Sequence, residues 1–432
     1  MATVSKRKIT PVLTEATLKR IRAESPESIS PEENKVRKIS TSIFLTPPPS
    51  TQSPTSEPNE RKNKIVLVPT ELHSIESYQF MGFTEQRAGY LYGKYLAMGD
   101  EDDSFLIVAL NFFSWNPINA YDDSDDWGVA MDNLGIRTDL QKALLKMQHR
   151  GILLTRDLLS WLTEIVEINY STLESMDWKV ETYLNMRKEP HLRGGEDDES
   201  ESESEPTVPK DHTRLYKSLD ASRLSDTFLA DGSIDLVTIM SHAPTDFTGI
   251  KLALYFTPQR WVADRYAALV NDAVQISDMR TLELHVPNKH LEEVTRWDLP
   301  FGDSWRQVLF YSRKSKEYPH DWRKDHSRKE LIVGPIAHNH NHAFRKMKSW
   351  TEVGEHNILR SQEGETALQY GETALQYVWM KTRTVERLQS DVQGKFFLHQ
   401  TYRGFRIIKQ PWNDQPGMAT TSKALQPFTN ET

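Results

Sequence analysis

The chain has 432 residues, a formal charge of −8 and no cysteine. The lack of thiols excludes disulfides, thiolate metal sites and cysteine nucleophiles, and it favours a reducing compartment. No apolar run approaches the roughly 20 residues that a membrane span needs, and the first residues lack the apolar core of a secretory signal. We therefore expect a soluble protein of the cytoplasm or nucleus that makes no membrane contact.

Residues 1–63 predict a disordered arm, because Ser, Thr, Pro and charged residues dominate and too little apolar surface is present to form a core. Four Ser-Pro or Thr-Pro pairs resemble proline-directed phosphorylation sites, at Ser25, Ser30, Thr46 and Ser53. Three short basic clusters are Lys6-Arg7-Lys8, Lys19-Arg20, and Lys35 with Arg37 and Lys38. They fit a nuclear-import signal, a nucleic-acid arm or an ordinary solvated tail. Nucleic acid is expected as a partner only through this arm.

Residues 64–190 predict a mainly helical module. Within it, "IVLVP" and "SFLIVALNFFSW" are apolar enough for strands or a buried helix. "TDLQKALLKMQHRG" predicts a helix with a capping box of Thr138 and Gln141 and an end at Gly151. Apolar residues between Leu158 and Ile168 recur close to helical spacing. The acidic, serine-rich segment 191–212 then predicts an extended linker and a domain boundary.

Residues 213–412 predict an α+β domain, because short strand patterns occur with scattered helices and without regular βα alternation. The expected strands lie at 252–256, 281–286, 306–312, 330–337, 375–381 and 394–400. A helix is expected between the first two, with Pro258 at its first position. Residues 413–432 predict a flexible tail.

The sequence "HNHNH" places His338, His340 and His342 at alternate positions, which on a strand would share one face and suit zinc. The segment follows Gly-Pro, precedes a helical pattern and has no evident carboxylate partner. We therefore favour a polar loop or a helix start, and we expect no metal site.

Five segments occur in an order that carries a resemblance: "RLYKS", "LALYFTPQRWVADRYA", "WRQVLFYSR", "LIVGPIA" and "LQYVWMKTRTVERL". Together they resemble a divergent ADP-ribosyltransferase-like domain, in particular a poorly characterised family of bacteria and fungi. The resemblance covers the C-terminal half alone and implies an NAD cleft between two small sheets. It implies cofactor contacts for Tyr216, Lys217, Tyr255 and Thr257, and a catalytic role for Gln376.

The sequence departs from the active pattern that this resemblance implies. Active relatives carry a glutamate at the third motif, where its charge stabilises a cationic sugar in the transition state, and Gln376 is neutral. Lys217 replaces an Arg or His, and Ser218 replaces a Gly. Without the resemblance, Thr257 also fits a helix N-cap and Tyr255 a core position.

Three functional hypotheses follow. The favoured one is a catalytically degenerate ADP-ribosyltransferase-like module that binds a nucleotide or a protein. The first alternative is an active NAD-dependent enzyme that modifies a protein or a small molecule. The second alternative is a nuclear interaction protein that phosphorylation regulates.

The heptapeptides Gly364–Tyr370 and Gly371–Tyr377 are identical. Only the second copy continues into an apolar run, so we expect it to lead into a strand and the first to lengthen the preceding loop. A catalytic role for Glu372 in the second copy is conceivable, although it precedes Gln376 by four residues. Whether the duplication matters for function is left open by the sequence.

Overall fold

The computed structural model describes residues 9–44, 64–98, 104–115, 126–188, 207–224, 227–228, 233–241, 245–249, 251–361 and 371–400. These residues form a mixed α+β structure, in agreement with the predicted fold class. In this described part of the chain, no helix combines the length and the apolar character that a bilayer crossing requires.

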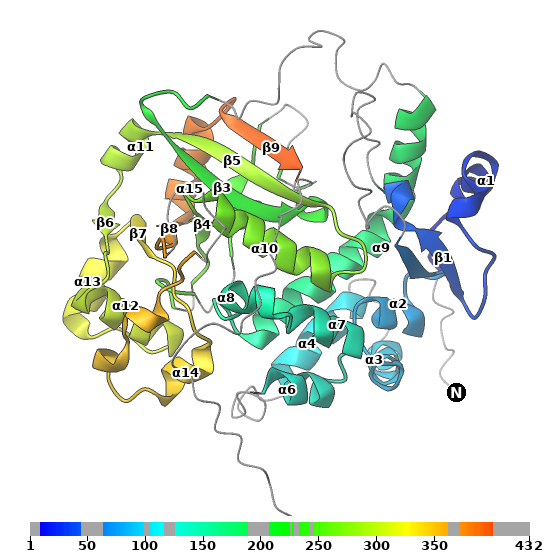
Figure 1. Ribbon diagram of the computed structural model, residues 1–432, viewed down its shortest axis with the longest axis horizontal. Helices are drawn as coiled ribbons and strands as arrows, with labels where there is room; N and C mark the ends of the chain where they lie inside the picture. The colour runs from blue at the N-terminus through cyan, green and yellow to red at the C-terminus, as the bar shows by residue number, and fades with distance from the viewer. Residues whose placement is uncertain are drawn as a thin grey trace, which may run out of the picture.

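The described helices are distributed along the whole chain (Figure 1). They are α1 (Glu15–Glu24), α2 (Ile75–Phe80), α3 (Glu85–Ala97), α4 (Ser104–Trp115), α6 (Trp127–Leu134), α7 (Thr138–Leu144), α8 (Arg150–Leu153), α9 (Leu158–Lys188), α10 (Arg260–Ala273), α11 (Asn288–Glu293), α12 (Asp303–Arg313), α13 (His320–Arg328), α14 (Asn341–Lys346) and α15 (Thr382–Asp391).

The described strands form three small sheets. They are β1 (Val36–Ser40), β2 (Ile65–Pro69), β3 (His212–Asp220), β4 (Leu254–Phe256), β5 (Met279–Pro287), β6 (Arg296–Asp298), β7 (Leu331–Pro335), β8 (Leu375–Trp379) and β9 (Phe396–Gln400). The sheet orders are β1-β2, β3-β5-β9 and β4-β8-β7-β6, and only β6 and β7 pair in parallel. A backbone bridge between Tyr216 and Thr257 links the second sheet to the third.

The N-terminal segment 9–44 is folded, so the prediction of disorder is wrong for these residues. Thr14 caps α1 by accepting a hydrogen bond from the Thr17 amide, and Ile21 packs into the same core as α9. Strand β1 pairs with β2 along its whole length. The sequence pattern misled because the segment lacks a core of its own and gains one only by packing against distant residues.

This fold bears on the predicted phosphorylation and import sites. Ser25 is 2% exposed at the end of α1, so a kinase can reach it only if this segment opens. Arg20 forms ion pairs with Glu24 and Glu181, so its charge is not part of a solvated basic cluster. Lys6-Arg7-Lys8, Thr46 and Ser53 lie outside the described residues.

The predicted capping box is wrong. Arg137 precedes α7 without a side-chain cap, while the Gln141 amide donates to Asp132 and to the Ile136 carbonyl. Gly151 lies inside the short helix α8 rather than at a helix end. Gln141 is buried and needs hydrogen-bond partners, which α6 and the turn after it provide. Its side chain therefore does not reach back to the start of α7.

Helix α10 joins the two halves of the chain. It lies under the three-stranded sheet and against α7 and α8 (Figure 1), and its residues Trp261, Leu269 and Val270 share one core with α9. Residues 191–206 of the predicted linker lie outside the described residues. Helix α10 therefore belongs to the core of the helical segment, while the two larger sheets also have hydrophobic cores of their own.

Asp272 of α10 provides a pH-dependent contact in this junction. His149 Nε2 lies 2.7 Å and Lys146 Nζ 2.8 Å from its Oδ2. Burial alone would raise the pKa of Asp272, but the hydrogen bonds with His149 and Lys146 outweigh it and lower the pKa to about 2 from 3.8. A carboxyl with a depressed pKa stabilises the fold above its unfolded pKa and loses this contribution as the pH falls towards the folded value.

We expect Asp272→Asn to lower the free energy of unfolding by about 2 kcal/mol at pH 7, since one pKa unit corresponds to about 1.4 kcal/mol. The difference from wild type should shrink between about pH 4 and pH 2, where the wild-type carboxyl becomes protonated. Urea unfolding of both proteins across this range measures it. A difference that stays constant with pH would exclude the ionised contact as the cause.

Two predicted elements in the C-terminal half need correction. Residues 306–312 belong to helix α12 rather than a strand, because Trp305, Val308, Leu309 and Ser312 are buried at helical spacing. The helix predicted to begin at Pro258 begins at Arg260 instead, since Thr257 continues β4 into the bridge with Tyr216 and Gln259 occupies the N-cap position.

Candidate functional site

The five predicted site residues do not converge on one pocket. Side chains alternate between the two faces of a strand, and the cores on either side show which face each residue occupies. Lys217 shares its face of β3 with Leu215 and Leu219, in the core between the two larger sheets. Tyr216 therefore lies on the outer face of the three-stranded sheet.

Tyr255 and Gln376 occupy a third layer. Tyr255 pairs with Val378 across β4 and β8, and both pack in the core formed with α12. Gln376 shares that face of β8 with Val378, whereas Tyr377 and Trp379 face the core between the sheets. The predicted catalytic residue thus points away from Lys217, on the opposite side of the four-stranded sheet.

The other predicted contacts are already engaged within the chain. Lys217 Nζ lies 3.4 Å from Ser241 Oγ, and the Tyr216 hydroxyl accepts a hydrogen bond from Arg214 at 3.1 Å. The Thr257 hydroxyl donates to Gln259 Oε1 and accepts from the backbone N–H of Gln259. Gln259, rather than the predicted Thr257, occupies the N-cap position of α10.

Gln376 instead belongs to a buried polar network centred on Asp246. The side chain of Gln376 is 5% exposed, and its Nε2 donates to Asp246 Oδ2 at 2.7 Å and to the Pro335 carbonyl at 3.2 Å. The Ala337 amide donates to the same carboxylate oxygen at 2.8 Å. The amide nitrogen of Gln376 is therefore committed to holding a buried carboxylate.

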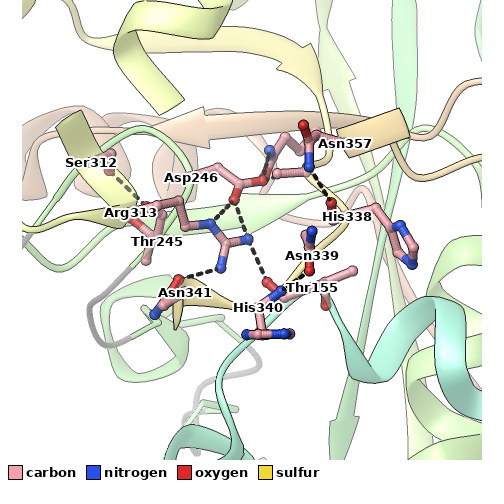
Figure 2. Close-up of polar contacts among 12 residues, drawn as sticks. Thr155, Thr245, Asp246, Ser312, Arg313, His338, Asn339, His340, Asn341 and Asn357 are labelled. Carbon is pink, nitrogen blue, oxygen red and sulfur yellow. Dashed lines mark hydrogen bonds and ion pairs between the residues drawn. The ribbon is translucent and has the colours of Figure 1, made fainter. Parts of the chain in front are cut away.

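Arg313 neutralises that carboxylate from the end of α12 (Figure 2). Its Nε donates to Asp246 Oδ1 at 2.7 Å, and one terminal nitrogen lies 2.5 Å from the same atom. The other terminal nitrogen donates to Asn341 Oδ1 at 2.9 Å. Both charged side chains are at most 5% exposed, so the ion pair is shielded from water and from salt screening.

The same network reaches the helical half of the chain. Arg313 donates to the carbonyl of Thr155 at 2.5 Å, as Figure 2 shows. Asn341 donates to Asp157 Oδ2 at 2.9 Å, and Asp157 Oδ1 accepts from the Ser160 amide at the start of α9. The backbone N–H of Asn339 donates to the Leu154 carbonyl. We call this set of contacts around Asp246, Arg313 and Asn341 the latch.

Residues beside the latch are also held by internal hydrogen bonds. Ser312 donates to the Thr245 carbonyl and accepts from the Gly249 amide, which fixes the loop that carries Asp246. Burial raises the pKa of the Tyr255 hydroxyl well above its usual value, against the opposing effect of Thr245 and Thr248. Tyr255 therefore stays protonated. It lies in the core, which was the alternative to a cofactor contact for this residue.

The three histidines of "HNHNH" form a loop and a helix start, as favoured from the sequence. His340 precedes α14, and its Nδ1 accepts a hydrogen bond from the Ala343 amide, while His342 lies inside the helix. Burial lowers the pKa of His338, and the positive charges of Arg150 and Arg265 lower it further. Within the described ranges, no three His, Asp or Glu side chains have a geometry that could hold a metal ion.

The second heptapeptide copy leads into β8, as predicted, while the first copy lies outside the described residues. Gly371 has φ 83°, a left-handed conformation that favours glycine. The two carboxylate oxygens of Glu372 accept hydrogen bonds from Gln259 at 3.3 Å and Trp261 at 3.2 Å. Glu372 therefore ties the start of α10 to the segment before β8.

The latch has the chemistry of a structural centre. Its carboxylate, guanidinium and amide groups are paired with each other or with the backbone, an arrangement that lowers the cost of burying them. Sequence reasoning missed Asp246, Arg313 and Asn341, because they lie in three separate segments with no local motif. The only signal was the polar Gln376 within an apolar strand, which indicated a buried partner.

No protein-family model matches this chain, and no curated protein or solved structure matches it.

Proposed function

We propose that this chain uses an ADP-ribosyltransferase-like architecture for binding a partner and does not transfer ADP-ribose from NAD. The resemblance of its strand motifs is the reason for considering NAD at all. The position of Gln376 is the observation that carries the proposal: its amide holds the buried Asp246, on the sheet face opposite Lys217.

The charge distribution supports the same conclusion. Transfer of ADP-ribose needs negative charge beside a developing cationic sugar. Asp246 is the carboxylate next to Gln376, and Arg313 compensates its charge at 2.5 Å. A group that is neutralised and buried in this way cannot stabilise an external cation without breaking the latch.

Calorimetric titration of NAD into the full-length protein tests the proposal. We expect no heat of binding up to millimolar NAD, for both wild type and Lys217→Ala. We substitute Lys217 because it lies between the two larger sheets, where the resemblance places the cofactor. Micromolar binding that Lys217→Ala abolishes would contradict the proposal and support a working cofactor cleft.

A further inference from the structure

A second polar cluster lies on the outer face of the three-stranded sheet, away from the latch. Glu283 and His285 of β5 and His399 of β9 project from that face, as does Arg214 of β3. Glu283 is fully buried and His285 is 3% exposed, whereas the side chains of His399 and Arg214 are 21% and 23% exposed. The cluster therefore has a buried base and an accessible rim.

Both oxygens of Glu283 are occupied by imidazole nitrogens. His285 Nε2 lies 2.6 Å from Oε1, and His399 Nε2 lies 2.8 Å from Oε2. Arg214 Nε is 3.1 Å from Oε1. Although burial alone would raise it, the hydrogen bonds from His399 and His285 and the charge of Arg214 hold the pKa of Glu283 below its usual value.

This geometry fixes the roles of the two ring nitrogens of His399. A carboxylate accepts hydrogen bonds, so a neutral His399 donates its Nε2 proton to Glu283 and keeps the lone pair on Nδ1. A carboxylate in this position also stabilises the imidazolium that forms when Nδ1 takes up a proton. The Nε2 atoms point at Glu283 rather than at a shared point, which explains why the group does not suit a metal ion.

We propose that His399 is a general base in an acid–base site on this face, with Glu283 as its positioning residue. The substrate class follows from the surroundings. The ionised Glu283 and Arg214 cancel in charge, and the Phe397 ring is 37% exposed on the same face of β9. Phe397 also lies 4.8 Å from the His285 ring. An uncharged substrate with an apolar group, such as a small ester, fits this combination best.

The corresponding reaction is ester hydrolysis. His399 Nδ1 takes a proton from water as the water oxygen bonds to the acyl carbon. The ester C–O bond then breaks, the alcohol oxygen leaves, and the proton on His399 passes to the leaving alcohol or to solvent. Ester and water give acid and alcohol, and no other reactant is required.

Hydrolysis of p-nitrophenyl acetate by the full-length protein tests the proposal. We expect saturable hydrolysis by wild type and an about 100-fold lower kcat in His399→Gln, the size typical of a lost general base. The glutamine amide can still donate to Glu283, so this variant keeps the contact and removes the base. Glu283→Gln should lower kcat as well, whereas Phe397→Ala should raise KM.

Two further variants separate catalysis from a structural role. Added imidazole should restore hydrolysis in His399→Ala, because a free base can enter the space left by the side chain. His356→Gln, which changes an exposed histidine elsewhere, should hydrolyse the ester at the wild-type rate. The proposal is overturned if wild type is no faster than His399→Gln, if His356→Gln loses as much rate, or if imidazole restores nothing. None of these results depends on whether NAD binds.

Discussion

Arg313→Ala is expected to lower the free energy of unfolding by about 3–5 kcal/mol, the loss typical when one partner of a buried ion pair is removed. The substitution leaves the Asp246 carboxylate buried without its countercharge. It also removes the hydrogen bonds to Asn341 and to the Thr155 carbonyl, which connect the sheets to the helical half. Urea unfolding, followed by tryptophan fluorescence, measures the change.

Arg306→Ala is the matched control on the same helix. Arg306 lies 3.9 Å from Asp303 and over the Phe301 ring, and its side chain is 29% exposed. Such partly exposed pairs contribute about 1 kcal/mol or less. If both variants lose the same stability, Arg313 has no special role and the latch is not a major connection between the two halves.

Gln376→Glu is expected to destabilise the fold by about 2–4 kcal/mol at pH 7, because two carboxylates in contact cannot both stay ionised. The new carboxylate would replace an amide nitrogen that lies 2.7 Å from Asp246 Oδ2. Repulsion from Asp246 raises the folded-state pKa of the new carboxyl group above its unfolded value. The loss should therefore be largest at neutral pH and shrink towards about pH 4, where the group is protonated in both states.

Gln376→Met separates charge repulsion from the loss of the amide. It removes both hydrogen bonds of the amide nitrogen without adding charge, so its cost should be smaller than that of the glutamate variant and independent of pH. Urea unfolding at pH 7 and pH 4 measures both variants. Equal losses for the two at pH 7 would contradict the placement of Gln376 against Asp246.

Local patterns predicted much of the secondary structure. The amphipathic run after Pro258 indicated α10, and the apolar run after Gly371 indicated β8. Residues 306–312 were misread because a short apolar run fits either a strand or a buried helix, and only its packing decides. Residues 9–44 were misread for a related reason, since their apolar partners lie on α9 and are distant in sequence.

The candidate site was less predictable than the fold. The resemblance placed Tyr216, Lys217 and Gln376 together, but alternation along the strands puts them in three different layers. The residue that decides the role of Gln376 is Asp246, which is 130 positions away in sequence. No local spacing rule connects residues so far apart, because their contact depends on how β8 packs against the loop that carries Asp246.

The most direct test of the central claim is NAD consumption by wild type and Gln376→Glu, measured side by side as nicotinamide release. If position 376 lay in a cofactor cleft, the glutamate would supply the carboxylate that ADP-ribose transfer needs, and the rate would rise. We predict no release above the rate without protein for either form. NAD consumption that appears or increases in Gln376→Glu would contradict the burial of residue 376 in the latch and would support the hypothesis of an active transferase.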